Sequence, residues 1–384
     1  MKFHQAHLAY CTNIHPAETW EETLHVLRTN VLAVRDILRD KDLIPLDQAF
    51  GIGLRLSAVA ARELLGGDHL ADFKAWLEET QTYVFSINGF PYGNFHGTRV
   101  KERVFQPDWT DRARLDYTKD LFRILAVIAS PESGASVSTL PGSHKTFAAD
   151  EALIHGNLIE LAEWLEQLSN ETGHDFHLGL EPEPLGHFEN TEETLAFFAR
   201  LHAAAPDTEI IRRRIGVNYD ACHFALEYEE AESSLDALKN ADIRISKIHL
   251  SSALAFDPRD PTAVAEIRAF DEPTYFHQVL MRHQSGKIQR FLDLPDFLAA
   301  NEIPGAISAR VHFHIPLDAE PMPPLSSTRD HARDVLIWMK EHPTACAHCE
   351  IETYTWGVLP AEMQRPVEEQ IAGEYGWVIA CAND

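Results

Sequence analysis

Basic residues are scarce in this sequence. Its 384 residues include 33 Lys and Arg against 59 Asp and Glu, so the formal net charge is −26 with His neutral. The densest basic run, Arg212-Arg213-Arg214, stands alone. A protein that binds nucleic acid needs a basic face to neutralise phosphates, so this balance argues against nucleic acid as a partner. We expect the surplus carboxylates to form a solvated surface.

Cysteine is also sparse, with five residues in the whole chain. An odd and scattered set in a chain of this length does not form a disulfide framework. Cys346 and Cys349 have the C-x-x-C spacing, but no second pair of this kind completes a four-cysteine zinc site. Buried free thiols are the simpler interpretation.

Long apolar runs are missing. No run approaches the roughly 20 apolar residues that a membrane span needs. The first five residues mix polar and apolar types, without the apolar region of a signal peptide. We therefore expect a cytoplasmic protein with no membrane insertion. No internal repeat or low-complexity linker divides the sequence, so residues 1–384 are predicted to form one domain.

The sequence does contain a regular alternation of short apolar runs and long amphipathic stretches, which is typical of βα units and a parallel sheet. The predicted strands are 8–14, 52–57, 83–88, 135–140, 177–181, 215–219, 245–250, 311–315 and 349–354. The predicted helices are 19–38, 111–128, 148–168, 192–201, 230–239, 294–300 and 328–341. Thr19 and Glu22 have the spacing of a capping box at the start of the first helix.

These elements predict an α/β fold, a (β/α)8 TIM barrel, because a single barrel with insertions commonly reaches this length. Nine predicted strands are one more than a barrel holds. The first segment, the 311–315 segment or another must lie outside the ring, and the sequence leaves this choice open. Residues 272–292 are predicted to form a β-hairpin insertion after the seventh strand, with its turn at Ser285-Gly286.

Polar groups recur where the predicted strands of the second half end. Glu181, then Asp220 with His223, then His249 follow three successive strands, and Cys349-Glu350-Ile351-Glu352 belongs to the last. In a parallel barrel these ends converge on one face, where active sites lie. Carboxylate and imidazole together suit Zn²⁺, Mn²⁺, Fe²⁺ or Co²⁺. We therefore expect a divalent metal ion at this face.

Each residue alone has a plainer explanation. A His at a strand end is more often a hydrogen-bonded structural residue than a ligand, and a Glu-Pro dipeptide is more often a turn. The joint pattern over four βα units favours a metal site, because carboxylates inside apolar runs need partners when buried.

The order Leu-Glu-Pro, Asp-x-x-His, Ile-His-x-x-Ser and Ile-Glu-Thr resembles that of the xylose isomerase-like TIM barrels. This superfamily contains sugar isomerases and epimerases and endonuclease IV-type enzymes. The resemblance implies a divalent metal ion held by Glu181, Asp220, His249 and one of Glu350 and Glu352. Ile351-Glu352-Thr353 matches the family pattern better, so Glu352 is preferred. The resemblance also implies that His223 is a second-metal ligand, as in the nuclease branch, or a substrate contact, as in the sugar branch.

One departure from the superfamily argues against DNA repair. A three-metal nuclease site also needs histidine ligands after the second and third strands. This sequence has Arg55-Leu56-Ser57 and Asn88-Gly89 at those places.

Over nearly its whole length the chain is more closely similar to the EboE family of metabolite traffic proteins. The segments that carry the resemblance are YCTNIHP (10–16), GLRLS (53–57), SINGFPYGNFH (86–96), STLPGS (138–143), VHFHIP (311–316) and EIETYTW (350–356). The family is associated with bacterial gene clusters that move or modify secondary metabolites. The resemblance implies a sugar phosphate isomerase/epimerase-like fold strongly and the reaction weakly, because fold does not fix function.

Further polar residues are expected around the metal face. Asn13 and His15 follow the first strand. Arg55 follows the second, where it pairs either with an anionic substrate group or within a buried structural ion pair. A glycine- and aromatic-rich loop is expected to form a substrate wall or a rigid structural loop, and its polar members include Asn88, Tyr92 and His96.

The later histidines add to this set. His312 and His314 alternate along a predicted strand and so point the same way, as a second-metal ligand and a base or as pocket lining. His277 in the predicted hairpin is expected to cap the site. Glu183 shares a face with Glu181 and is expected to support it or to bind substrate. Glu350 likewise shares a face with Glu352 and is the alternative ligand.

The sequence is compatible with three functions. The first is a metal-dependent isomerase or epimerase for a small hydroxy-carbonyl compound or secondary metabolite, with Glu181 and Glu352 moving the proton. The second is a metal-dependent hydrolase or lyase for an aromatic or polyketide-like metabolite, in which His312 and His314 are catalytic. The third is a non-enzymatic metabolite-binding protein that keeps the metal site. All three predict a small-molecule partner, and a homo-oligomer is compatible with each.

Overall fold

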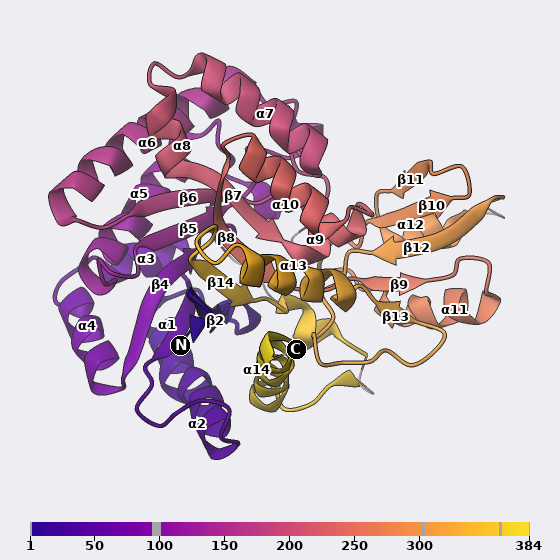
Figure 1. The fold of residues 1–384 in the computed structure, drawn as a ribbon, viewed down its shortest axis with the longest axis horizontal. Helices are drawn as coiled ribbons and strands as arrows, with labels where there is room; N and C mark the ends of the chain where they lie inside the picture. The colour runs from indigo at the N-terminus through magenta and orange to yellow at the C-terminus, as the bar shows by residue number, and fades with distance from the viewer. Residues whose placement is uncertain (1, 94–100, 301–303, 361–362, 384) are drawn as a thin grey trace.

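The computed structural model describes residues 2–93, 101–300, 304–360 and 363–383, which form a barrel with an appended antiparallel sheet (Figure 1). Within these residues eight parallel strands make up the ring, and the short β1 (Lys2–Phe3) pairs antiparallel with the first of them. In chain order the ring strands are β2 (Ala6–Tyr10), β3 (Phe50–Arg55), β4 (Thr82–Asn88), β5 (Ala135–Thr139), β6 (Phe176–Leu180), β7 (Ile215–Asp220), β8 (Arg244–Leu250) and β14 (His348–Ile351). The ring closes between β2 and β3, where Cys11 and Gly53 form a parallel bridge. The predicted (β/α)8 barrel is confirmed.

The ring strands form where the sequence has short apolar runs. Every residue of β5, β6 and β7 is buried, because helices cover one face of the ring and packed side chains fill the other. Strands buried on both faces lose the polar alternation of a surface strand. This is why they were visible in the sequence as apolar runs between helical stretches.

Helices surround the ring (Figure 1). They are α1 (Trp20–Val26), α2 (Leu32–Asp40), α3 (Ala58–Leu64), α4 (His69–Glu79), α5 (Arg112–Ile128), α6 (Glu151–Thr172), α7 (Thr191–Ala204), α8 (Thr208–Arg214), α9 (Ala221–Leu226), α10 (Ala231–Asn240), α13 (Arg329–Glu341) and α14 (Val367–Asn383). The predicted 19–38 helix is α1 and α2 joined by the π-helical segment η2 (Leu27–Val31), and it begins with the expected capping box of Thr19 and Glu22. No helix in the described ranges combines the length and apolar character that a membrane crossing requires.

Between β8 and α13 the chain leaves the ring and forms a second sheet, drawn in orange beside the barrel in Figure 1. Its strands are β9 (Leu254–Phe256), β10 (Val279–His283), β11 (Ile288–Phe291), β12 (Ala306–Val311) and β13 (Ser326–Ser327), with helices α11 (Pro261–Glu266) and α12 (Leu294–Ala299). The expected hairpin is β10 and β11, which turn at Gly286 with a φ of 83°. The insertion is larger than the hairpin alone.

The inserted sheet also shows which predicted strand lies outside the ring. The 311–315 segment is the extra one, since β12 ends at Val311 and pairs with β9 and β10 instead of a ring strand. The insertion buries an apolar cluster of its own, separate from that of the barrel. Members of this cluster include Leu254, Val279, Met281, Ala309, Val311 and Phe313.

Gly53 in β3 connects the fold to the site, because it leaves room for a buried carboxylate inside the ring. A Cβ atom at this position would lie 2.6 Å from the carbonyl oxygen of Tyr10 and 2.7 Å from Cδ of Glu350. Either contact is too close for a side chain. A residue with no Cβ at this point therefore allows Glu350 of β14 to point into the barrel.

Candidate metal centre

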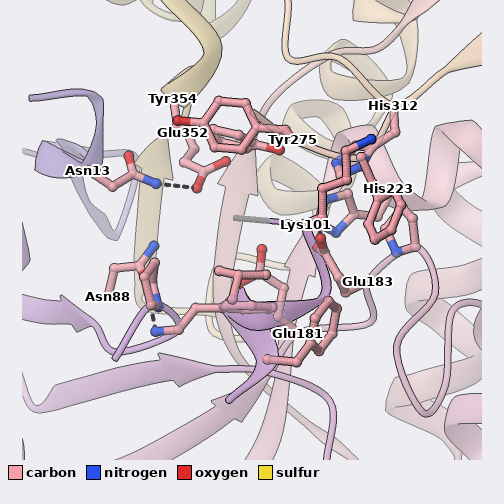
Figure 2. A pocket seen from close by; sticks show the side chains of 16 residues that line it. Asn13, Asn88, Lys101, Glu181, Glu183, His223, Tyr275, His312, Glu352 and Tyr354 are labelled. Atoms are coloured by element: carbon pink, nitrogen blue, oxygen red, sulfur yellow. Dashed lines mark hydrogen bonds and ion pairs between the residues drawn. The ribbon is translucent and has the colours of Figure 1, made fainter. Parts of the chain in front are cut away.

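A pocket of about 640 Å³, including its mouth, opens where the ring strands end (Figure 2). Its polar lining consists of Asn13, Asn88, Lys101, Glu181, Glu183, His223, His312 and Glu352. Among the described residues, its aromatic lining consists of Phe90, Phe105, Tyr275, Phe276 and Tyr354. The polar residues come from five ring segments and from the exit of the inserted sheet, so the pocket lies on the face where barrel active sites are found.

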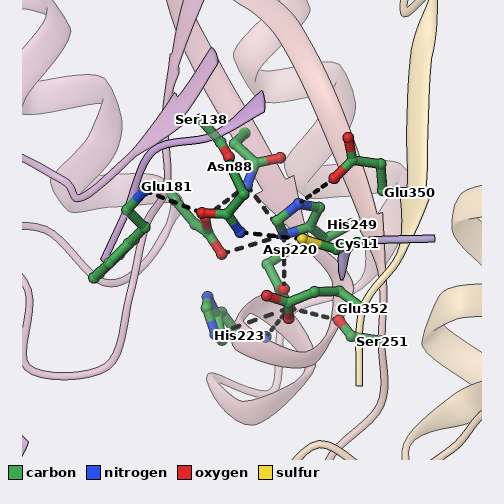
Figure 3. A network of polar contacts seen from close by, with 12 residues as sticks. Cys11, Asn88, Ser138, Glu181, Asp220, His223, His249, Ser251, Glu350 and Glu352 are labelled. Atoms are coloured by element: carbon green, nitrogen blue, oxygen red, sulfur yellow. Dashed lines mark hydrogen bonds and ion pairs between the residues drawn. The ribbon is translucent and has the colours of Figure 1, made fainter. Parts of the chain in front are cut away.

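Three of the predicted ligands lie together beneath this pocket (Figure 3). His249 of β8 has Nδ1 3.4 Å from Oε1 of Glu181 and 3.5 Å from Oδ2 of Asp220. One ligand atom from each residue lies within 4.8 Å of the other two, and all three residues are buried. Ligand atoms at this spacing are compatible with binding to one shared cation.

Neighbouring polar groups hold both carboxylates in place. Asn218 donates from Nδ2 to Oε2 of Glu181 at 2.7 Å and lies 3.2 Å from Nδ1 of His249. Oδ1 of Asp220 accepts from Ser251 Oγ at 2.6 Å and from the N–H of Cys222 at 2.8 Å, because Asp220 caps the start of α9. Oδ2 of Asp220 is buried and has no hydrogen-bond partner among the described residues. One oxygen of Asp220 is therefore fixed, and the other faces His249.

Glu350 lies on the far side of His249 from this group. Its Oε2 is 3.4 Å from Nε2 of His249 and accepts from Lys247 Nζ at 3.0 Å, and Lys247 also donates to Ser138 Oγ at 2.8 Å. Carboxylates thus lie at both ring nitrogens of His249, with Glu350 at Nε2 and Glu181 and Asp220 at Nδ1. A cation bound between Glu181 and Asp220 would take the Nδ1 lone pair and leave the proton on Nε2, toward Glu350. In this geometry Glu350 orients His249 and lies outside the pocket lining.

The charges of these groups are strongly coupled. Burial opposes ionisation of Asp220, but the surrounding histidines hold its pKa well below the usual range. Burial and Lys247 oppose a charge on His249, yet Glu181 and Asp220 raise its pKa well above the usual value. Burial likewise opposes the ionisation of Glu350, and the ammonium of Lys247 lowers its pKa to about 2. The centre therefore stabilises positive charge between Glu181 and Asp220.

Replacing Glu350 by Ala is expected to destabilise the protein strongly. The change leaves Lys247 buried without its ion-pair partner, and breaking a buried pair in this way costs about 3–5 kcal/mol. Chemical denaturation of the metal-free protein at pH 7 measures this loss. Since the folded pKa of Glu350 is depressed, the difference from the wild type should shrink as the pH falls from about 4.3 toward 2.

The double variant Lys247→Met with Glu350→Leu is the matched control, because it removes both charges. It should recover most of the lost stability. An equal loss in the double variant would contradict the ion-pair explanation.

Glu352, the preferred fourth ligand, lies outside the close group of Glu181, Asp220 and His249. Its Oε1 accepts from Asn13 Nδ2 at 2.7 Å, and its Oε2 is 2.9 Å from Nδ1 of His314. Figure 2 shows Glu352 beside Asn13, on a different side of the pocket from Glu181 and Glu183. The two glutamates expected to move a proton thus enter the pocket from different strands.

A second group of histidines lies next to the first. The ring centroids of His223 and His312 are 4.9 Å apart, those of His223 and His314 are 5.6 Å apart, and those of His312 and His314 are 5.5 Å apart. The expectation that His312 and His314 alternate along a strand is wrong, because both follow the end of β12 in a loop. The loop nevertheless brings both rings next to His223.

Glu183 belongs to this second group, with Oε2 3.1 Å from Nε2 of His223. Burial beside Glu181 and Asp220 raises the pKa of Glu183 well above its usual value. Burial beside His223 and His314 lowers the pKa of His312 well below its usual value. His312 is thus held as a neutral imidazole, the form that binds metal ions.

Several residues expected around the site have structural partners instead. Arg55 donates to the carbonyl of Ala17, to Glu18 at 3.0 Å and to the carbonyl of Gly93 at 2.6 Å, so it forms the structural ion pair. The other three residues make these structural contacts: His15 with the Tyr10 hydroxyl at 3.0 Å, Tyr92 with the ring of Tyr117 at 5.1 Å between centroids, and His277 with Glu272 and the His312 carbonyl, both at 2.9 Å. His15, Arg55, Tyr92 and His277 are absent from the pocket lining among the described residues. His96 lies outside those residues.

Asn88 does line the pocket. Its Oδ1 accepts from the N–H of Phe90 at 3.0 Å, and its Nδ2 faces Cys11 Sγ at 3.4 Å. The five cysteines are free thiols, and Cys346 and Cys349 are buried as expected.

The sequence interpretation missed Asn218, Lys247 and Ser251. Asn218 stands two residues before Asp220, and Lys247 stands two residues before His249, so each shares the inward face of its strand with a predicted ligand. This two-residue spacing can be read from the sequence alone, so both residues could have been predicted. Ser251 follows β8 directly and reaches Asp220 only through the packing of β7 against β8.

No family model and no curated protein sequence matches this chain. Solved structures do resemble it. The IolI protein with a bound zinc atom aligns over 98% of this chain and 98% of that chain, with 10% identity and a TM-score of 0.50. The probable 3-DHS dehydratase AsbF from Bacillus anthracis aligns over 96% and 97%, with 11% identity and a TM-score of 0.47. A xylose isomerase domain protein from Planctomyces limnophilus aligns over 86% and 88%, with 12% identity and a TM-score of 0.45.

These neighbours are xylose isomerase-like TIM-barrel proteins, and the chain has their fold. At such low identity the similarity concerns the fold alone. The chemistry of this chain depends on the residues of its own pocket, because fold does not fix function.

Proposed function

We propose that this protein is a metal-dependent isomerase or epimerase for a small hydroxy-carbonyl compound. The observation that carries the proposal is the buried group of Glu181, Asp220 and His249 beneath a pocket that a further carboxylate, Glu352, enters from another strand. Two carboxylates and an imidazole suit Zn²⁺, Mn²⁺, Fe²⁺ or Co²⁺. Oδ2 of Asp220, which accepts no hydrogen bond within the described residues and faces Nδ1 of His249 at 3.5 Å, supports this assignment, because a buried carboxylate oxygen needs a partner.

A divalent ion bound there would act as a Lewis acid toward a substrate carbonyl. The residues of the chain supply the rest of the chemistry. Glu352, held by Asn13, removes a proton from the carbon beside that carbonyl, and Glu181 returns one from a different side. Asn13 and Asn88 bind substrate hydroxyl groups, and the aromatic residues at the pocket exclude water.

The resemblance to metabolite traffic proteins supports a substrate from secondary metabolism. The aromatic lining favours a second candidate function, a hydrolase or lyase for a cyclic aromatic or polyketide-like metabolite. Phe90, Phe105, Tyr275, Phe276 and Tyr354 provide flat apolar surfaces for such a ring. A non-enzymatic metabolite-binding protein would use the same surfaces without turnover.

Incorporation of solvent deuterium into the substrate distinguishes these functions. The metal-loaded protein is incubated in D₂O with a panel of ketoses, aldoses and cyclic hydroxy-ketones, and the products are analysed by mass spectrometry and NMR. An isomerase or epimerase incorporates deuterium beside the carbonyl. A hydrolase or lyase instead gives products that have gained or lost water, and a binding protein gives neither. Binding of panel compounds with no exchange in any of them would contradict the proposed isomerase.

A further inference from the structure

One basic side chain lines the pocket, and the proposed reaction does not use it. Lys101 is the only Lys or Arg of the lining within the described residues, against Glu181, Glu183 and Glu352 (Figure 2). Only 12% of its side chain is exposed. An ammonium group so far removed from water needs partners. Its contacts therefore show how many of its donors are left for a ligand.

Asp293 holds Lys101 in place from the inserted sheet. Oδ2 of Asp293 accepts from Nζ of Lys101, and Oδ1 accepts from the N–H groups of His277 and Leu294, both at 3.0 Å. Asp293 is itself buried and caps the start of α12. The backbone N–H of Lys101 also donates to the carbonyl of Thr274 at 3.3 Å. The ammonium group is therefore fixed at one place beside the pocket.

The ammonium group of Lys101 keeps a donor for a ligand. A lysine carries three N–H donors. In the described part of the chain, Asp293 is the one hydrogen-bond acceptor of Nζ, and the ring centroid of Phe276 lies 4.9 Å from Nζ. The face of an aromatic ring attracts a cation. With these two partners in place, at least one N–H is left for an acceptor in the pocket.

A carboxylate suits this place better than other anions do. Its oxygens form short, charge-assisted hydrogen bonds with an ammonium group. Glu181 and Glu352 repel an anion elsewhere in the pocket, so a carboxylate is directed to Lys101. A phosphate dianion carries more charge and is repelled more strongly by the same glutamates. A single Lys and no Arg of the described lining would offset that repulsion.

We propose that Lys101 is a specificity-determining residue that binds a carboxylate group of the substrate. The hydroxy-carbonyl group would lie at the other end of the molecule, toward Glu181 and Glu352. Phe276, beside Lys101, provides an apolar face for a cyclic body between the two ends. The substrate class is then a cyclic hydroxy-ketone that carries a carboxylate. The inference rests on the proposed function, because it takes the pocket as the substrate site.

A purely structural link is the alternative role of the pair. Lys101 belongs to the 101–105 segment and Asp293 to the insertion, so the ion pair joins two parts of the chain. The two roles predict opposite results when Asp293 loses its charge. The link is then broken, whereas Lys101 loses a competitor for the substrate carboxylate.

The binding of two matched compounds tests the proposal. The probes are 3-hydroxy-4-oxocyclohexane-1-carboxylate and its carboxamide, which differ only in charge at the end away from the hydroxy-carbonyl group. Isothermal titration calorimetry of the zinc-loaded protein measures both affinities. We expect the wild type to bind the carboxylate about 10–100-fold more tightly, the range that one charge-assisted hydrogen bond supplies.

Variants of the ion pair separate the two roles. Lys101→Met should abolish the preference for the carboxylate, and Lys101→Arg should keep it. Asp293→Asn should bind the carboxylate at least as tightly as the wild type, because its amide oxygen still caps α12 while the competing charge is gone. Circular dichroism confirms that each variant is folded.

Lys145→Met is the matched control, since Lys145 forms an ion pair with Glu193 at 2.9 Å and lies outside the pocket lining. It should bind both probes as the wild type does. If Lys101→Met fails to fold, the wild-type preference and Asp293→Asn decide the matter.

Three results would overturn the proposal. They are equal affinity of the wild type for the two probes, an equal loss of carboxylate binding in Lys101→Met and Asp293→Asn, and tighter binding of the corresponding phosphate ester. A carboxylate preference that depends on Lys101, without deuterium exchange into the probe, supports the role of Lys101 and contradicts only the proposed isomerase.

Discussion

Asp220→Ala is expected to lose the metal ion of the candidate centre while the barrel stays folded. Asp220 is the central anion of the group, with Oδ2 turned to Nδ1 of His249 at 3.5 Å. Changes in groups that merely orient ligands weaken metal binding by about 10–100-fold, so removal of a ligand should weaken it by more than about 100-fold. Metal analysis after dialysis measures the loss.

The same change also removes a helix cap, since Asp220 accepts from the N–H groups of Cys222 and His223 at the start of α9. A lost cap costs about 1 kcal/mol, which a barrel of this size tolerates. Asp220→Asn separates the two effects, because its amide oxygen still caps the helix while the charge is gone. We expect Asn to restore stability without restoring metal. Stoichiometric metal in Asp220→Ala would show that the ligand set is wrong.

Glu352→Gln is expected to reduce kcat by about 10²–10⁴-fold, the usual contribution of a positioned base, with the metal content unchanged. The amide keeps the size of the side chain and the contact with Asn13 but no longer accepts a proton. Deuterium exchange into the substrate should fall in parallel with turnover. Glu350→Gln is a useful comparison, since Glu350 lies outside the pocket and acts through His249.

Two outcomes would reject this role for Glu352. Loss of metal from Glu352→Gln would make the residue a ligand, as the family resemblance implied. Unchanged turnover with metal bound would remove it from the chemistry.

The sequence predicted the barrel because β6, β7 and β8 are mostly apolar and buried, with a polar residue at or directly after the carboxyl end of each. It did not distinguish the 311–315 segment from a ring strand. Both kinds of segment are apolar, and only the pairing of β12 with β9 and β10 separates them. Pairing partners are set by tertiary packing and leave no local mark in the chain.

The sequence likewise predicted some residues of the site but not the roles of others. Glu181, Asp220 and His249 were found because each stands at a strand end, where topology alone places it on one face. The roles of Glu350 and Glu352 were not separable, since residues two apart share a face of a strand. In the structure β14 ends at Ile351, so Glu350 stays inside the ring and Glu352 turns into the pocket. Tertiary contacts with the adjacent strands determine the residue at which a strand ends.

The barrel and the inserted sheet have separate apolar clusters, yet His312 of the insertion lines the same pocket as Glu181 of the ring. A ligand held by both parts binds only when both are folded, so it stabilises them as a unit by mass action. Filling the pocket with a ligand should therefore make the two parts melt together, and without that ligand the sheet should be cleaved by protease while the barrel survives. The stability of the insertion is then expected to depend on whether the pocket is occupied.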